Sequence, residues 1–398
     1  MRNPFPTTRA SLSHPARRQQ TSRKVSAWCI TATLVFTCAF APAEPVSNPK
    51  ASYIDVQQRH EQLAHNQDPR IASAIASLKY CSKLPAVQPP TGRMIIPPHY
   101  LSGSHGPTNP AEAEATRVYY SFELRVTAGM NQWLVTSSKE EAQCAQQQID
   151  AWAQADALLA YDPKESSQAW YQVEWTLSSI AISESVLVNE PSLDPAQVKR
   201  DIQWLNKVAH RSVDFDKAGK QTNNHHYWRG LAAVSTGVIS SDDNLFNWGI
   251  GVYKQAINEL DQRGALPQEM ARHERAIHYQ SFALQPLIPL AEFAERQHGA
   301  LYQYRSPTEH TVNDAVDFFG QALANPEILK AYTPDTQLID DKGTDFFSFA
   351  EFYSHHVGAA QLPPSILEGL QQPTFATRIG GSTTVVDGYV PPASNKQK

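Results

Sequence analysis

The sequence predicts an all-helical fold of stacked helical hairpins, and three observations support this prediction. Apolar residues recur every three or four positions over most of the chain, which is the spacing of one face of an α-helix. Strand-like alternation is scarce before about residue 374, and the connections between most helical patterns are short. Such hairpins form a bundle, a solenoid or a closed (α/α) toroid. Periodicity does not choose among these, and no fixed-length repeat favours the solenoid.

The helical patterns are expected in order over residues 57–80, 111–136, 138–161, 166–187, 195–213, 243–263 and 267–298. After the pattern over 243–263, Gly264 provides a C-terminal stop. Pro267 stands where proline is tolerated at a helix start, whereas Pro286 and Pro289 are expected to kink or break the last pattern. A connection rich in proline and glycine spans 84–110, and long loops of this kind are often functional lids or binding loops.

The composition predicts a folded protein without general affinity for nucleic acid. Hydrophobic residues make up 41% of the 398 residues, which is enough for a sizeable core, and charged residues at 18% are too few for a disordered chain. The net charge of -5 argues against nucleic-acid binding. It does not exclude an acidic substrate, which a local cationic cleft could bind.

The N-terminal residues 1–43 have the pattern of a secretory signal peptide. An apolar stretch over 25–40 leads to Ala41-Pro42-Ala43, a small-x-small cleavage pattern. The basic residues that precede it are Arg17, Arg18, Arg23 and Lys24. The alternative is an uncleaved anchor, but the apolar run is shorter than the roughly 20 residues of a spanning helix. We therefore expect export to the periplasm and no stable membrane insertion.

Two cysteines, Cys81 and Cys144, remain after the expected signal. Cysteines in an oxidising compartment usually pair, so we expect a structural disulfide. Two buried free thiols are the alternative.

The densest polar and aromatic cluster is the run from Thr222 to Trp228, which reads Thr-Asn-Asn-His-His-Tyr-Trp. It stands at the start of a helical pattern, where asparagine is a favoured cap and the helix dipole favours anions. Any single residue could be an ordinary cap or surface residue. As a whole, the run favours a site that lines a cleft, with aromatic rings to stack on sugars and with Asn and His to hydrogen-bond hydroxyls and carboxylates.

Two further clusters have helical spacing. Arg272, Arg275 and Tyr279 share one face, and a guanidinium beside a phenol is expected to lower the pKa of the tyrosine. An exposed charged face is the alternative. Gln168, Tyr171 and Trp175 also share a face, which suits a carbohydrate subsite as well as core packing.

Other chemistries have little support in the sequence. It contains no H-E-x-x-H, no paired C-x-x-C, no phosphate-binding glycine loop and no G-x-S-x-G elbow. The adjacent pairs His225-His226 and His355-His356 diverge on a helix, so neither makes a good bidentate site. We expect neither a metal site nor a cofactor.

These motifs together resemble the periplasmic alginate lyases of the fifth polysaccharide lyase family, which cut poly-β-D-mannuronate. The resemblance rests first on Asn223-Asn224-His225-x-Tyr227-Trp228 and Asp243-x-Leu245-Phe246-x-Trp248. It continues through Gly264-x-Leu266-Pro267-x-Glu269, Arg272-x-x-Arg275-Ala276-x-x-Tyr279, Gln168-x-x-Tyr171-x-x-x-Trp175 and Phe375-x-x-Arg378-Ile379-Gly380-Gly381. It covers most of the chain after the signal, and its central block is the most specific part.

The resemblance implies an incomplete (α/α) toroid around a deep cleft, formed by residues 44–398 as a single domain. It implies a lid loop over about residues 95–112, and an irregular C-terminal tail over about residues 374–398 is expected as well. The implied catalytic residues are Asn224, His225, Arg272 and Tyr279. The implied substrate-binding residues are Tyr100, Gln168, Tyr171, Trp175, Trp228 and Arg378. The partner would be an anionic polysaccharide, bound by a monomer.

The family's reaction requires these residue types. β-Elimination removes the C5 proton of a uronate and expels the 4-O-linked sugar, so donors such as Asn224 and His225 are needed to neutralise the C6 carboxylate. Tyr279 would take the C5 proton and protonate the leaving oxygen, with Arg272 beside it. For guluronate, His225 would be the better-placed base.

The sequence departs from the family at several positions, which bear on substrate preference more than on reaction type. His99 precedes Tyr100 where a lysine is usual, and His226 replaces a serine. A lyase for another polyuronate and a non-catalytic periplasmic polysaccharide-binding protein are the alternatives. A toroidal glycoside hydrolase would need two opposed carboxylates, and nothing in the spacing of Glu269 and Glu351 singles them out.

Overall fold

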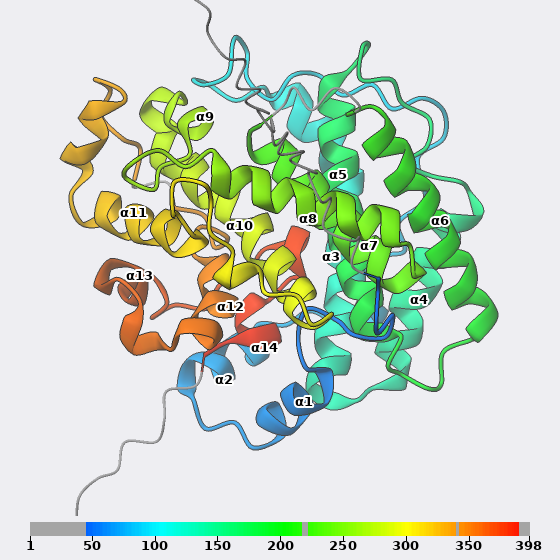
Figure 1. Cartoon of the computed structure of the whole chain (residues 1–398). Helices are drawn as coiled ribbons and strands as arrows, with labels where there is room; N and C mark the ends of the chain where they lie inside the picture. The colour runs from blue at the N-terminus through cyan, green and yellow to red at the C-terminus, as the bar shows by residue number, and fades with distance from the viewer. Residues whose placement is uncertain (1–44, 217–221, 340–341, 390–398) are drawn as a thin grey trace, which may run out of the picture. The chain divides into compact units, whose positions relative to one another are not determined.

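A computed structural model describes residues 45–216, 222–339 and 342–389, and the secondary-structure elements of these ranges are helices joined by turns and loops (Figure 1). The predicted signal peptide 1–43 and the end of the tail lie outside the described residues. The helices of the first half are α1 (Val56–Ala64), α2 (Pro69–Ala76), α3 (Pro110–Thr136), α4 (Lys139–Gln154), α5 (Ser167–Leu187) and α6 (Pro195–Asp214). The second half holds α7 (Asn224–Ser240), α8 (Asp243–Asn258), α9 (Pro267–Met270), α10 (Ala276–Glu295), α11 (Val312–Ala324), α12 (Ser348–Val357), α13 (Pro364–Gly369) and α14 (Thr383–Asp387).

Short 3-10 turns join several of these helices. They are η1 (Cys81–Lys83), η2 (His273–Arg275), η3 (Leu301–Gln303), η4 (Pro326–Ala331), η5 (Ala359–Gln361) and η6 (Thr377–Ile379). Within the described ranges, β pairing is limited to two isolated bridges, which join Tyr100 to Thr108 and Ala376 to Gly381. Of the helices in these ranges, none is both long and apolar enough to cross a bilayer.

Most predicted helices begin at the residues that the sequence indicates, because side-chain caps stand there. Ser166, Asp194 and Asp242 each accept a hydrogen bond from a backbone N–H of the first turn of α5, α6 and α8. The single helix expected over 57–80 is wrong. It is divided into α1 and α2, because Asp68 caps a new helix with Pro69 at its first position.

Pro286 and Pro289, expected to kink or break this segment, do not break it, since α10 runs through both prolines. Nearly every residue of α10 is buried, so tertiary packing outweighs the missing hydrogen bonds. The chain is interrupted earlier in the same segment, between α9 and α10, where Arg272 and the η2 turn lie.

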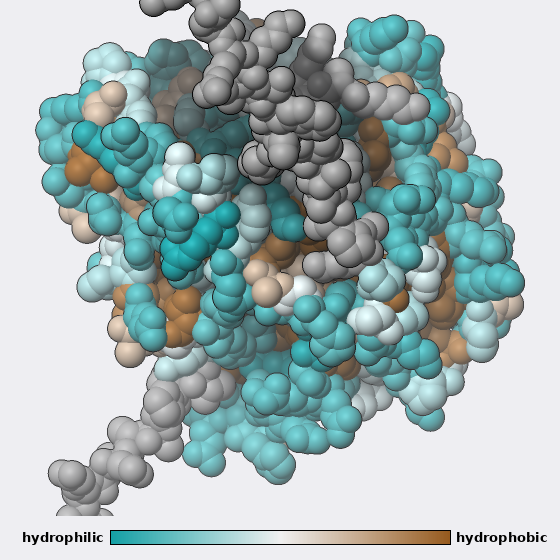
Figure 2. Space-filling model, viewed as in Figure 1, coloured by the Kyte–Doolittle hydropathy of each residue, from teal (hydrophilic) through white to brown (hydrophobic). Residues whose placement is uncertain are grey.

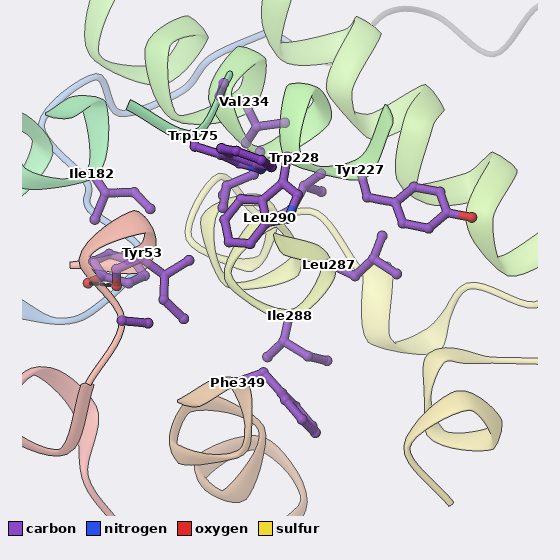
Figure 3. Close-up of a cluster of buried hydrophobic side chains, with 14 of the residues drawn as sticks. Tyr53, Trp175, Ile182, Tyr227, Trp228, Val234, Leu287, Ile288, Leu290 and Phe349 are labelled. Carbon is purple, nitrogen blue, oxygen red and sulfur yellow. Dashed lines mark hydrogen bonds between the residues drawn. The ribbon is translucent and has the colours of Figure 1, made fainter. Parts of the chain in front are cut away.

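The core is built around α7, which packs against α5, α6, α8 and α10. Figure 3 shows part of this core, with the buried side chains of Trp228 from α7, Leu287, Ile288 and Leu290 from α10, and Phe349 from α12. On the face drawn in Figure 2, the surface that is not covered by grey residues is mostly hydrophilic. The apolar core packs around most of α7 and so holds its polar first turn, with Asn224 and His225, in place.

Two links join segments that are distant in the sequence. Cys81 and Cys144 form a disulfide that joins the turn after α2 to α4. The buried Arg59 of α1 donates to the carbonyl oxygens of Thr384, Val385 and Gly388 at the end of α14. The strand-like composition after residue 374 thus forms η6 and a short helix, not a strand.

Candidate active site

A cleft of about 1160 Å³ opens between the lid loop, the helices α3, α5, α7 and α10, and the segment around η6. Among the described residues, its walls hold four arginines and three carboxyl groups, besides several histidines and aromatic rings. The arginines are Arg117, Arg272, Arg275 and Arg378. An anionic chain in this cleft would meet several guanidinium groups, although the net charge of the protein is negative.

His225 lies in the first turn of α7 and is held on several sides. Its ring stacks on Tyr171, with ring centroids 3.5 Å apart and an interplanar angle of 16°, and Trp175 lies 5.6 Å away. Its Nδ1 lies 2.7 Å from Oε1 of Glu174. Burial, followed by the charges of Arg272 and other arginines, holds the pKa of His225 well below its ordinary value. The imidazole is therefore neutral at physiological pH.

Asn224 is bound to a buried carboxyl group. Its backbone N–H donates to Oε1 of Glu269 at 2.5 Å, and its side-chain Nδ2 donates to Oε2 at 3.0 Å. Burial raises the pKa of Glu269 to about 7, against the opposing effects of Arg272 and Asn224. Asn224 lines the cleft, and its amide has a second N–H besides the one that Glu269 accepts.

Tyr279 meets the lid tyrosine inside the cleft. The hydroxyls of Tyr279 and Tyr100 are 2.7 Å apart, and the guanidinium carbon of Arg272 lies 4.2 Å from the centre of the Tyr279 ring. The expected lowering of the tyrosine pKa is wrong for the free protein. Burial and the neighbouring Tyr100 raise the pKa of Tyr279 well above its ordinary value, and Arg272 offsets only part of this effect.

The lid loop is fastened to the segment between α9 and α10. Arg272 donates from Nη1 to the carbonyl oxygen of Ser104 at 2.9 Å, and Gly106 donates its N–H to Glu274 at 3.1 Å. His105 lies 3.3 Å from Glu274 and packs against His273, with ring centroids 4.3 Å apart and the rings tilted by 30°. The lid therefore covers Tyr279 in this structure.

The structure brings most of the predicted substrate-binding residues to the cleft wall. Gln168, Tyr171 and Trp175 line it from α5, and Tyr100 from the lid. Arg378 lies over Trp175, with its guanidinium carbon 4.3 Å from the ring centre. Trp228 does not line the cleft. It is 0% exposed and packs against Phe282, so it cannot stack on a bound sugar.

Two buried ionisable residues near the site were not predicted from the sequence. Glu174 and Arg229 are both 0% exposed, and Oε2 of Glu174 lies 3.3 Å from Nη2 of Arg229. In the sequence, Glu174 stands among apolar residues of α5 and shows no sign of a functional role. Its contact with His225, 51 positions away in the sequence, appears only in the structure. Among the residues that the structure describes, no group of three or more His, Cys, Asp or Glu side chains is arranged to hold a metal ion.

Comparison with known proteins identifies the family. A family model described as alginate lyase matches residues 48–329. A polysaccharide lyase of Stenotrophomonas maltophilia is 29% identical over 63% of this chain and 67% of its own length. An alginate lyase of Pseudomonas aeruginosa is 27% identical over 76% of this chain and 84% of its own length.

Among solved structures, alginate lyase A1-III of Sphingomonas species A1 is similar with a TM-score of 0.80 and 37% identity. A variant of A1-III complexed with a tetrasaccharide has a TM-score of 0.82, and the match covers 88% of this chain and 99% of that chain. The A1-III fold is an (α/α) toroid, so the predicted fold class is confirmed. The family model spans well over half of the sequence, and this chain belongs to the alginate lyase family.

Proposed function

We propose that this protein is a polysaccharide lyase that cleaves alginate, preferentially at mannuronate, by β-elimination at the 4-O-glycosidic bond. The observation that carries the proposal is the meeting of four side chains in one cationic cleft: Tyr279, Arg272, Asn224 and a neutral His225. Membership of the alginate lyase family supports the substrate.

The first requirement of the reaction is to make the C5 proton of the uronate acidic. Donors must neutralise the C6 carboxylate as negative charge moves onto it in the transition state. Asn224 supplies an amide N–H, His225 supplies a ring N–H, and Arg272 adds positive charge. These groups are fixed by buried carboxyls and stacked rings before substrate arrives, so little reorganisation is needed.

The second requirement is a base and an acid for the two proton transfers. In mannuronate the C5 proton and the leaving oxygen lie on one face of the sugar, so Tyr279 can remove the proton as phenolate and return it to the oxygen as phenol. In the free protein its raised pKa keeps it protonated, and the phenolate becomes more abundant as pH rises.

Export to the periplasm is a separate proposal. Residues 1–43 have the pattern of a signal peptide, and the disulfide between Cys81 and Cys144 fits an oxidising compartment. Cell fractionation and N-terminal sequencing of the mature protein test it, with Glu44 as the expected first residue. A mature protein that retains residues 1–43 would contradict it.

The test of the lyase proposal is the ultraviolet absorbance of unsaturated uronates, measured with mature protein on mannuronate-rich, guluronate-rich and acetylated alginates. Wild type should give a rise that is fastest on the mannuronate-rich polymer. Tyr279→Phe should reduce the rate by about 10²–10⁴-fold, the usual effect of losing a general acid or base. Tyr304→Phe is the matched control, because it removes a tyrosine hydroxyl that does not line the cleft.

Each outcome decides between the proposed function and an alternative. No rise on any alginate by folded protein would reject alginate as substrate, and other glycuronans would then be screened. A rise on one of these would indicate another polyuronate lyase. Tight binding of alginate without product would indicate a polysaccharide-binding protein.

A further inference from the structure

The contacts of His225 on its buried side decide which of its two ring nitrogens can meet a ligand in the cleft. Nδ1 is occupied by Glu174 at 2.7 Å, Tyr171 stacks on the ring, and Trp175 lies 5.6 Å away between ring centroids. Nε2 has no hydrogen-bond partner among the described residues, and His225 lines the cleft. Nε2 is therefore the nitrogen that a substrate would meet. Whether it donates or accepts there depends on which atom holds the proton at Nδ1.

Glu174 shares one buried guanidinium with a second carboxylate. Arg229 donates from Nη1 to Oδ2 of Asp216 at 2.6 Å, and Asp216 also lies 2.7 Å from Nδ1 of His226. The contact from Arg229 to Oε2 of Glu174 is longer, at 3.3 Å, and this oxygen has no hydrogen bond within the described part of the chain.

The two carboxyl groups therefore differ in charge. Burial opposes ionisation of Asp216, but the hydrogen bonds from His226 and Arg229 outweigh it and lower its pKa. Burial raises the pKa of Glu174 well above its ordinary value, and Arg229 offsets only part of this effect. Asp216 is held closely by both His226 and Arg229 and is the carboxylate that neutralises the guanidinium, so this arrangement favours the protonated form of Glu174. A protonated carboxyl can donate a hydrogen bond, which an ionised one cannot.

We propose that Glu174 is a positioning residue whose carboxyl O–H donates to Nδ1 of His225 and so holds the imidazole in the tautomer with hydrogen on Nε2. In this tautomer His225 presents a donor to the cleft, as neutralisation of a uronate carboxylate requires. The opposite tautomer would present a lone pair to that carboxylate and repel it. The inference deepens the proposed function and rests on it for its kinetic consequence, but not for the tautomer itself.

Two substitutions separate hydrogen bonding from packing. Glu174→Gln has nearly the same shape, and its amide N–H can donate to Nδ1 in place of the carboxyl, so the tautomer should be kept. Glu174→Leu fills the space but cannot donate. Glu184→Leu is the matched control, because Glu184 lies on the same helix, is equally buried and does not line the cleft.

The direct measurement is nuclear magnetic resonance of histidine labelled with nitrogen-15, which distinguishes the two neutral tautomers. The signal of His225 is identified by its loss in His225→Ala. The spectra are recorded at one fixed pH near neutrality, so that the protonation states around His225 and Glu174 are the same in every variant. The titratable and charged groups around these two residues include Arg229, Asp216, Arg272, Arg378 and His99. Wild type and Glu174→Gln should have hydrogen on Nε2, and Glu174→Leu should lose this preference.

The kinetic measurement is the rate of appearance of unsaturated uronate. Loss of a residue that orients a functional histidine typically costs about 10–100-fold, so kcat of Glu174→Leu should fall by this amount. Glu174→Gln should remain within about threefold of wild type, as should Glu184→Leu. If the carboxyl group only filled space, Glu174→Leu would not be slower than Glu174→Gln. A difference between these two variants therefore indicates hydrogen bonding to His225.

The outcomes separate this inference from the proposed function. Hydrogen on Nδ1 of His225 in wild type would overturn the inference, even in an active lyase. An unchanged tautomer and unchanged kcat in Glu174→Leu would overturn it as well. If Glu174→Leu does not fold, the spectra of wild type and Glu174→Gln still decide. A protein without activity on any glycuronan would reject the proposed function, while the spectra would still test the role of Glu174.

Discussion

At the scale of single residues, the site depends on buried carboxyl groups behind the groups that face the cleft. Glu269 binds the backbone and side chain of Asn224, and Glu174 binds His225. Burying a carboxyl group is costly unless it is hydrogen-bonded, so each of these groups is tied to the residue that it supports. Removal of either carboxyl should disturb function before it disturbs the fold.

The raised pKa of Tyr279 predicts that elimination becomes faster with increasing pH. Below its pKa, the fraction of phenolate increases about tenfold per pH unit. His225 does not oppose this trend, because its low pKa keeps it neutral throughout the neutral and alkaline range. The measurement is kcat/KM on mannuronate oligomers against pH, with circular dichroism to verify folding. A rate that falls as pH rises from neutral, in folded protein, would contradict Tyr279 as the base.

The sequence could indicate the exposed part of this site but not its buried support. The clusters at 222–228 and 272–279 are recognisable because polar and aromatic residues gather at helix starts, where ligands commonly bind. Glu174 lies three residues from Tyr171, and nothing nearby indicates that its partner is His225, 51 positions away. The aromatic ring of Trp228 would suit a sugar, yet its position on α7 directs it into the core.

At the scale of elements, α7 carries Asn224 and His225 and is positioned by close packing on α8. A Cβ atom added at Gly249 of α8 would lie 2.6 Å from the carbonyl oxygen of Gly230 on α7 and would also collide with Val234. Gly251 lies on the same helix, and nothing is within 4 Å of a Cβ added there. The two glycines therefore form a matched pair.

Gly249→Ala should destabilise the protein by about 1–3 kcal/mol, the usual cost of overpacking a core. Gly251→Ala should be neutral or stabilising by up to about 1 kcal/mol, because alanine is the better helix former. Chemical denaturation of both variants measures this difference. Equal stability of the two variants would contradict the close packing of α7 on α8.

The lid is expected to depend on Glu274, which accepts from the backbone of Gly106 and pairs with His105. Glu274→Ala removes both contacts, so hydrogen exchange of the lid residues 101–108 should become faster. KM for alginate should rise, because the lid would spend less time closed over substrate. Glu309→Ala, which breaks an exposed ion pair with Arg305, is the control. Unchanged exchange in the lid would mean that Glu274 does not hold it.

Helix positions were predictable where local chemistry decides them and not where tertiary contacts do. Capping residues such as Ser166 and Asp194 define the starts of α5 and α6. The continuity of α10 through Pro286 depends on burial by neighbouring helices, which periodicity cannot reveal. Likewise, the short helix α14 depends on Arg59, more than 300 residues earlier in the chain.

At the scale of the whole molecule, several buried carboxyl groups make stability depend on pH. Burial raises the pKa of Glu184 to about 8, of Asp201 to about 9 and of Glu292 to about 8. A carboxyl with a raised pKa binds its proton more tightly in the folded state. Its contribution is fully present below the unfolded pKa, near 4.5 for Glu292, and is lost as pH rises to about 8.

The melting temperature should therefore fall as pH rises from about 5 to about 9. Each such group carries on the order of a few kcal/mol. Glu292→Gln should make the fall less steep, because a neutral amide does not titrate, whereas the exposed Glu309→Gln should leave it unchanged. Scanning calorimetry over this range provides the measurement. A melting temperature that increases with pH in this interval would contradict the buried, protonated carboxyls.

The central claim, that the cleft performs elimination, is tested most directly by the products formed in water enriched in heavy oxygen. Mass spectrometry of mannuronate oligomers after digestion distinguishes the two ways of breaking the glycosidic bond. Elimination leaves an unsaturated end and incorporates no oxygen from water, and this is the expected result for wild type. Saturated products that carry one heavy oxygen per cleavage would mean hydrolysis, and would contradict the role assigned to Tyr279.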